Sequence, residues 1–327
     1  MRSRSRIAAW VVGLTVTAVV ATLGCGGGGG EDSGIQLNGV AFGQRPGAAT
    51  GAFVAVGDSD RIFVNVGNGW TPYLSGVAAL QSVAWSERLD TFVAVGVGGT
   101  IATIGVTIFP DGTEQVAIVP QGSPTSADLF GVAVGDGGLI AVGAGGTILA
   151  SSDAVTWVPR SSNTDASLNG VAFGASGEVV AVGENSVVVA SANAGVDWAA
   201  SEVGFPDQPD VVIGNLNGVA YGSNGWVVAG EGGVLLQADT PGAWTLQGYQ
   251  ILPNLFGVAF VEGLYTVVGE NGRILTSPDG ITYGQSVSNS GQFLYGVAFG
   301  NGNFFVVGSG GRALQSVDGA IYLDRKV

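Results

Sequence analysis

From residue 35 onward the chain is a succession of short apolar runs separated by glycine-rich turns. One stretch reads Leu255–Phe260, then Tyr265–Gly269, then Arg273–Ser277, and after a Pro-Asp-Gly turn comes Tyr283. Runs this short and this rich in valine and aromatic residues are typical of β-strands, not helices. Both faces of the runs are apolar, which predicts sheets that are packed on both sides.

The phrase Leu-x-Gly-Val-Ala-aromatic-Gly recurs along the chain with a period of about 40 residues. Its third position falls at Gly39, Ser82, Gly131, Gly170, Gly218, Gly257 and Gly296. Each unit contains four predicted strands, and one four-stranded sheet cannot bury two apolar faces without neighbours. We therefore expect an all-β, seven-bladed β-propeller of four-stranded antiparallel blades over residues 35–327. The Gly-Val-Ala run should be innermost, and blade packing should close the ring without a shared blade.

Composition agrees with this fold and narrows the chemistry. The chain has 58 glycines, 46% hydrophobic residues and 11% charged residues, as many short strands and tight turns require. A net charge of −14 disfavours nucleic acid as a partner, because phosphates would be repelled. The chain has no histidine and one cysteine, which excludes Ser–His–Asp triads, imidazole zinc sites and internal disulfides. We expect no cofactor and no metal ion.

The N-terminal segment has the features of an export signal. Arg2, Arg4 and Arg6 precede the uncharged apolar stretch Ile7–Leu23, which ends in small residues before Cys25. The segment resembles a bacterial lipoprotein signal, and the resemblance implies that the Cys25 thiol is acylated.

We therefore divide the chain into a lipoprotein-type signal peptide at 1–25, a glycine-rich tether at 26–34 and the propeller. Gly26 after the cysteine favours sorting to the outer membrane in a Gram-negative cell. The alternative is an uncleaved anchor helix over Ile7–Gly24, which is just long enough to span a bilayer. Both interpretations place the propeller outside the cytoplasm.

A Ser-Asp turn follows the third strand of several units. Ser191 to Trp198 reads Ser-Ala-Asn-Ala-Gly-Val-Asp-Trp, and shorter forms recur. Serine and aspartate oxygens are expected to accept backbone N–H groups of the turn, and the aromatic residue is expected to pack between blades. The residues assigned to these turns are Ser151, Asp153, Trp157, Ser191, Asn193, Gly195, Trp198, Ser277, Asp279, Tyr283, Ser316, Asp318 and Tyr322.

These turns resemble the Asp box of the bacterial neuraminidase repeat. The whole unit resembles photosystem II assembly-factor-like propellers over about residues 35–327. In that family the turn is a folding device, so the resemblance implies a fold and not an activity. Units one, two and five carry degenerate forms around Trp70, Phe109–Gly112 and Trp244.

Three arginines form the candidate ligand or partner contact. Arg61, Arg273 and Arg312 begin the third strand of units one, six and seven, which are neighbours in a closed ring. They should share a face with variable links between blades, where recognition by rigid scaffolds usually occurs. The alternative is that Asp58 and Glu270 hold Arg61 and Arg273 in surface ion pairs.

Four acids share another repeat position, namely Asp58, Glu184, Glu231 and Glu270. We expect these acids to lie in turns without binding a ligand, and calcium binding is the alternative.

We expect a non-catalytic, extracytoplasmic, lipid-anchored binding or assembly scaffold, whose partner is a protein or glycan of the cell envelope. No catalytic residue is assigned. The alternative is a sialidase-like glycan-active hydrolase or a glycan-binding protein, since carboxylates suffice for glycoside hydrolysis without histidine. That hydrolase requires two carboxylates and a tyrosine that converge at the channel mouth. A role in photosystem assembly would rest on fold analogy alone.

Replacing Cys25 by serine tests the anchor. Without a thiol no acyl chain can be attached, so Cys25→Ser should move the protein from the membrane fraction to the soluble fraction. Labelled fatty acid should be incorporated in the wild type and not in the variant. A wild-type protein without label would show that the lipoprotein assignment is wrong.

Overall fold

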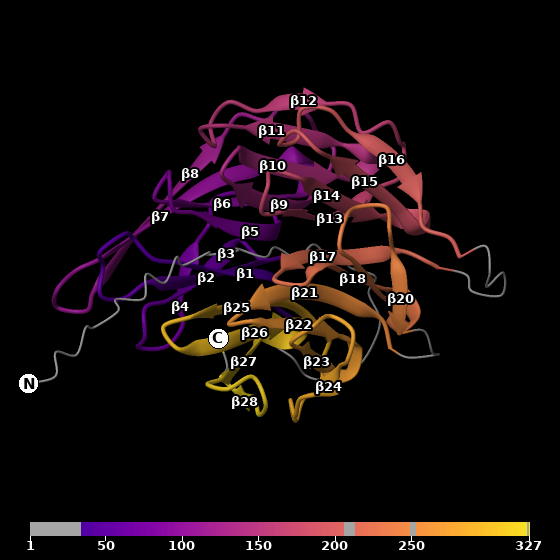
Figure 1. Cartoon of the computed structure of the whole chain (residues 1–327). Helices are drawn as coiled ribbons and strands as arrows, with labels where there is room; N and C mark the ends of the chain where they lie inside the picture. The colour runs from indigo at the N-terminus through magenta and orange to yellow at the C-terminus, as the bar shows by residue number, and fades with distance from the viewer. Residues whose placement is uncertain (1–33, 206–212, 249–252, 326) are drawn as a thin grey trace, which may run out of the picture.

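Seven four-stranded antiparallel sheets are arranged in a ring (Figure 1). The computed structural model describes residues 34–205, 213–248, 253–325 and Val327. Within each sheet, four consecutive strands are hydrogen-bonded in chain order, so each sheet is one blade. The predicted all-β seven-bladed propeller is confirmed.

The first strands of blades 1 to 7 are β1 (Leu37–Gly43), β5 (Leu80–Ser86), β9 (Leu129–Gly135), β13 (Leu168–Phe173), β17 (Leu216–Gly222), β21 (Leu255–Val261) and β25 (Leu294–Gly300). The second strands are β2 (Ala52–Gly57), β6 (Thr91–Gly96), β10 (Gly138–Gly143), β14 (Val179–Gly183), β18 (Gly225–Gly230), β22 (Leu264–Gly269) and β26 (Asn303–Gly308). The third strands are β3 (Arg61–Asn65), β7 (Ile101–Ile108), β11 (Ile148–Ser151), β15 (Val187–Ser191), β19 (Leu235–Ala238), β23 (Ile274–Ser277) and β27 (Arg312–Ser316). The fourth strands are β4 (Thr71–Leu74), β8 (Glu114–Gln121), β12 (Val158–Arg160), β16 (Ala199–Glu202), β20 (Thr245–Gly248), β24 (Gly284–Gln285) and β28 (Leu323–Asp324).

The hydrophobic core is divided among the interfaces between blades. In one interface, Val93 and Ile101 of blade 2 pack against Leu129 and Leu139 of blade 3, and all four are at most 1% exposed. Burying one such side chain stabilises the fold by about 1.5–3 kcal/mol. The strands are apolar on both faces because each blade contributes one face to each neighbouring interface.

The second residue of the repeated phrase joins the first strands of neighbouring blades. Asn38, Asn169 and Asn217 are buried, and each donates its side-chain N–H to the carbonyl of the first leucine in the next blade. The distance from Asn217 Nδ2 to the Leu255 oxygen is 2.8 Å. These amides thus provide donors for carbonyl groups of leucines that are at most 1% exposed.

Two glycine positions are explained by close approach of backbones. A methyl group at Gly170 would lie 2.9 Å from the carbonyl oxygen of Asn217 in the next blade. A methyl group at Gly57, which ends β2, would lie 1.9 Å from the carbonyl oxygen of Gln36. Where blade 2 has Ser82 in place of glycine, the hydroxyl accepts the backbone N–H of Val132 in blade 3.

Direct packing of the first blade on the last closes the ring, so no blade is shared, as predicted (Figure 1). Phe53 of blade 1 contacts Phe305 of blade 7 with ring centroids 4.7 Å apart. The amide of Asn301 in blade 7 both donates to and accepts from the backbone of Gly51 in blade 1.

The ring has two faces. The link face carries the turns between second and third strands, such as 58–60, and the segments that lead into first strands. The opposite face carries the turns between first and second strands, such as 44–51, and those between third and fourth strands; we call it the cavity face. The residues that lead into β1 lie on the link face. There the carbonyl of Ile35 accepts the N–H of Gly311 in blade 7 at 2.7 Å.

Replacing Asn217 by leucine should destabilise the ring. The change keeps the approximate volume but leaves the buried Leu255 carbonyl without a donor, which costs about 1–3 kcal/mol. Urea unfolding at pH 7 measures the loss. Asn68→Leu, at an exposed turn residue, is the matched control and should change the free energy of unfolding far less. Equal effects from the two variants would contradict the bond's structural role.

Candidate functional site

A cavity of about 510 Å³ lies on the cavity face, where the first strands of four consecutive blades end. We call it the axial cavity. Blades 6, 7, 1 and 2 contribute its walls. Its apolar lining includes Ala41, Phe42, Ala259, Val261, Ala298 and Phe299.

Aromatic residues of the repeated phrase support these walls. Phe42, Phe260 and Phe299 are half-buried at the ends of β1, β21 and β25. Each packs against an aromatic ring of its own second strand, as in Phe299 and Phe304, whose centroids are 4.7 Å apart. The rings are therefore held in place by the blade before any ligand binds.

The rim of the axial cavity is acidic. Glu87 and Glu262 line it and are exposed, and neither forms an ion pair within the described part of the chain. The cavity is also lined by Arg45, but its Nε lies 2.7 Å from an oxygen of Asp90. The arginine charge is thus already compensated, and the two glutamates are not.

The described residues that line the axial cavity do not form the set needed for sialidase-like hydrolysis. They include no tyrosine, and their one arginine is ion-paired. A Tyr–Glu pair does occur, between Tyr73 and Glu114 at 3.0 Å, but it joins the outermost strands β4 and β8. Burial and the neighbouring Glu114 raise the pKa of Tyr73, which disfavours the phenolate that a nucleophile requires.

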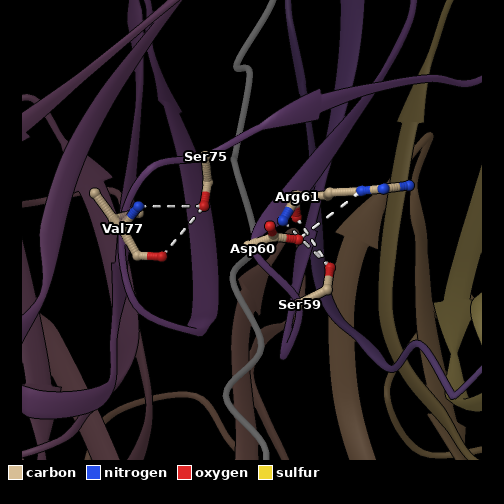
Figure 2. A network of polar contacts seen from close by, with 5 residues as sticks. All are labelled: Ser59, Asp60, Arg61, Ser75 and Val77. Atoms are coloured by element: carbon tan, nitrogen blue, oxygen red, sulfur yellow. Dashed lines mark hydrogen bonds and ion pairs between the residues drawn. The ribbon is translucent and has the colours of Figure 1, made fainter.

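The three predicted contact arginines lie on the link face of three consecutive blades. Figure 2 shows Arg61 extending past Asp60 and away from the Ser75–Val77 contact. Arg61 Nε is 3.9 Å from Asp60, and Arg312 is ion-paired with Asp324. The described part of the chain contains no ion pair of Arg273.

The predicted alternative, in which Asp58 and Glu270 pair with these arginines, is wrong. Asp58 accepts the backbone N–H of Gln36 at 2.8 Å, and Glu270 accepts that of Asn254 at 3.2 Å. Glu184 and Glu231 bind Ser167 and Asn215 in the same way. Each acid therefore accepts the backbone N–H of the residue that precedes a first strand.

This capping accounts for the shared repeat position of the four acids. Among the described residues, no three His, Cys, Asp or Glu side chains gather in a group that could hold a metal ion.

The Ser-Asp turns are held by side-chain hydrogen bonds. Ser151 Oγ accepts the N–H of Ala154, and Asp153 Oδ1 accepts those of Val155 and Thr156 at 2.9 and 2.7 Å. The same pattern occurs around Ser191 with Asn193, Ser277 with Asp279, and Ser316 with Asp318.

The aromatic residues of these turns are buried. Trp157 and Trp198 are 6% exposed, and their indole N–H groups donate to the carbonyls of Ala154 and Gly195. Tyr322 is fully buried, and Tyr283 packs against the core between blades 5 and 6.

Sequence patterns did not reveal the axial cavity or its rim. Arg45, Glu87 and Glu262 lie in turns between first and second strands, outside the repeated phrase. The available signal was the length of the first of these turns, 44–51, in a chain where the others are short. Cys25 lies outside the described residues, and within those residues no helix has the length and apolarity needed to cross a bilayer.

Comparison with known proteins supports the fold. No family model and no curated protein matches the chain. Among solved structures, YCF48 bound to D1 peptide is 15% identical with a TM-score of 0.61, over 94% of this chain and 96% of that one. YCF48 from Cyanidioschyzon merolae is 16% identical with a TM-score of 0.62, over 91% and 98%.

The WD40 β-propeller domain of Doa1 is 11% identical with a TM-score of 0.61, over 90% of this chain and 93% of that one. At these identities the similarity shows the propeller fold. The chain is thus a seven-bladed propeller similar to YCF48.

Acid should weaken the Ser-Asp turns. Backbone N–H donation from Thr156 and Val155 lowers the pKa of Asp153 to about 2, against about 3.9 in an unfolded chain. A depressed folded-state pKa contributes stability above the unfolded pKa, and that stability is lost as the pH falls toward 2.

Asp153→Asn keeps an acceptor oxygen and removes the titration, so its melting temperature should fall less between pH 5 and pH 2 than that of the wild type. Asp136→Asn, at an exposed acid with no hydrogen bond in the described part, is the control. A control with the same reduced pH dependence would refute the assignment.

Proposed function

We propose that the protein is an exported, non-catalytic scaffold of the bacterial cell envelope, anchored through a lipid on Cys25, that binds a segment of another protein. The observation that carries the proposal is the axial cavity, which has apolar walls and, among the described residues, no tyrosine beside its two carboxylates. The structure of YCF48 with a bound D1 peptide supports it by showing that a propeller of this fold binds peptide.

The chemistry of the axial cavity defines the segment. Apolar walls favour aliphatic or aromatic side chains, and rim charges select partners of opposite sign. Because Glu87 and Glu262 are uncompensated, the segment should carry lysine or arginine next to its apolar residues.

The anchor gives this surface an orientation. The ten residues from Cys25 to Gly34 span at most about 35 Å when extended. The chain joins the ring on the link face, at Ile35. A lipid on Cys25 would therefore tether the ring at its link face and leave the axial cavity, on the opposite face, free to meet a partner.

We assign the Ser-Asp turns to the Asp-box repeat. The support is the hydrogen-bond pattern of the serine and the aspartate or asparagine in blades 3, 4, 6 and 7. The assignment concerns folding, since these oxygens are occupied by backbone N–H groups of their own turn.

The arginine sector of Arg61, Arg273 and Arg312 is the second candidate contact. What favours it is that the three side chains occupy one position in three consecutive blades. It would bind an acidic segment rather than a basic one.

Charge reversal separates the two surfaces. Binding of a fluorescent peptide of alternating lysine and leucine, followed by anisotropy, should weaken about tenfold or more in Glu87→Lys/Glu262→Lys. Both residues are exposed, so the fold should be unaffected.

The triple variant Arg61→Glu/Arg273→Glu/Arg312→Glu is the matched control and should bind the peptide as the wild type does. Preferred binding of a glutamate–leucine peptide, lost in the triple variant, would instead place the partner on the arginine sector. Hydrolysis of a fluorogenic sialoside by the wild type would refute the non-catalytic assignment.

A further inference from the structure

A second cavity, of about 490 Å³, lies between blades 7 and 1, where the two ends of the propeller meet. We call it the seam cavity. Its walls come from β2, β3 and the following turn of blade 1, and from β26, β27 and the end of β28 in blade 7. It shares no lining residue with the axial cavity.

Aromatic rings form one part of the seam cavity. Phe305 contacts Phe53 at 4.7 Å and Trp70 at 5.3 Å between centroids, and the Trp70 and Phe305 planes are 86° apart. Phe53 and Phe305 are at most 5% exposed, whereas Trp70 is half-buried. Trp70 therefore offers ring surface to a ligand, with the two phenylalanines fixed behind it.

The indole N–H of Trp70 is unused. In blades 3 and 4 the corresponding Trp157 and Trp198 donate to a carbonyl of their own turn at 3.2 and 3.0 Å. The turn of blade 1 is shorter, and Trp70 Nε1 is buried without a hydrogen-bond partner among the described residues. Because this nitrogen is inaccessible to solvent, a ligand acceptor would reach it only after a small shift of the ring, and the bond would then satisfy a donor that is otherwise unfavourable to bury.

Further polar groups surround the ring. Asn65 uses its oxygen to accept the N–H of Gly67 at 2.8 Å, and its side-chain NH₂ has no partner within the described part. Arg325 donates through Nε to Gln315 at 2.8 Å, which leaves its terminal nitrogens available. Asp324 is ion-paired with Arg312, and the pair supplies an acceptor near these donors.

We propose that the seam cavity is a saccharide-binding site that takes a pyranose ring. The C–H groups on a pyranose face pack against an aromatic ring, and each sugar hydroxyl both donates and accepts hydrogen bonds. Trp70 supplies the ring surface and a donor, Asn65 and Arg325 supply donors, and Asp324 supplies an acceptor. The volume suits a short saccharide.

The site is independent of the proposed protein contact at the axial cavity. Failure of one leaves the other intact, because their lining residues do not overlap.

Indole N–H signals in ¹H–¹⁵N NMR spectra of the full-length protein test the proposal. The probes are cellobiose and N,N′-diacetylchitobiose, with sorbitol as an acyclic polyol of similar hydroxyl content. At least one disaccharide should shift the Trp70 signal saturably, and sorbitol should not. Trp70→Phe identifies the signal and should lower the affinity.

Asn65→Asp keeps the oxygen that binds Gly67 and removes the NH₂ group, so it should weaken binding about tenfold. Trp244→Phe is the matched control, because the Trp244 indole N–H is also buried without a partner but lines neither cavity. It should bind sugar as the wild type does, and Trp70→Phe should leave binding of the lysine–leucine peptide unchanged.

The proposal is overturned if neither disaccharide shifts the Trp70 signal. It is also overturned if Trp70→Phe and Asn65→Asp, at wild-type melting temperature, bind sugar as tightly as the wild type.

Discussion

The close contact between first strands of neighbouring blades is the interaction on which the rest of the ring depends. Gly170 allows the backbone of β13 to approach that of β17, and Asn169 bridges the two strands by a buried hydrogen bond. Only this approach brings the second and third strands near enough to bury their valines and leucines between blades. The residues of the repeated phrase therefore serve the interface between neighbouring blades as well as the strand in which they lie.

The same contact leaves the two faces of the ring chemically unequal. On the link face, polar side chains form hydrogen bonds within the fold. Glu231 accepts the backbone N–H of Asn215, and the Asn215 side-chain oxygen accepts the backbone N–H of Asn185 in the preceding blade. On the cavity face, most first strands end in an aromatic residue, and the turns that follow them differ in length between blades. Space for ligands appears there beside the long 44–51 turn of blade 1.

The seam between the two ends of the chain is a second irregularity. Every other blade interface joins units that are continuous in sequence, whereas blades 7 and 1 are joined by packing and by hydrogen bonds such as those between Asn301 and Gly51. The shortened turn before Trp70 leaves an indole donor and a cavity at this interface. A saccharide site there requires no change in the contact that closes the ring.

The sequence by itself determined the number of blades, the strand order and the innermost strand, because each depends on a pattern that recurs within one unit. It also determined the Ser-Asp turns, since serine, aspartate and the N–H groups they bind lie within a few residues of one another. Local hydrogen bonds and periodic burial can be read from local sequence.

The tertiary structure alone decided how distant residues are used. Asp58 and Arg61 are three residues apart and of opposite charge, yet Asp58 caps Gln36, because the second strand returns it beside the start of the first. The axial cavity joins Glu87 to Glu262, and the seam cavity joins Trp70 to Arg325. Those pairs are far apart in the chain and meet only because the ring closes.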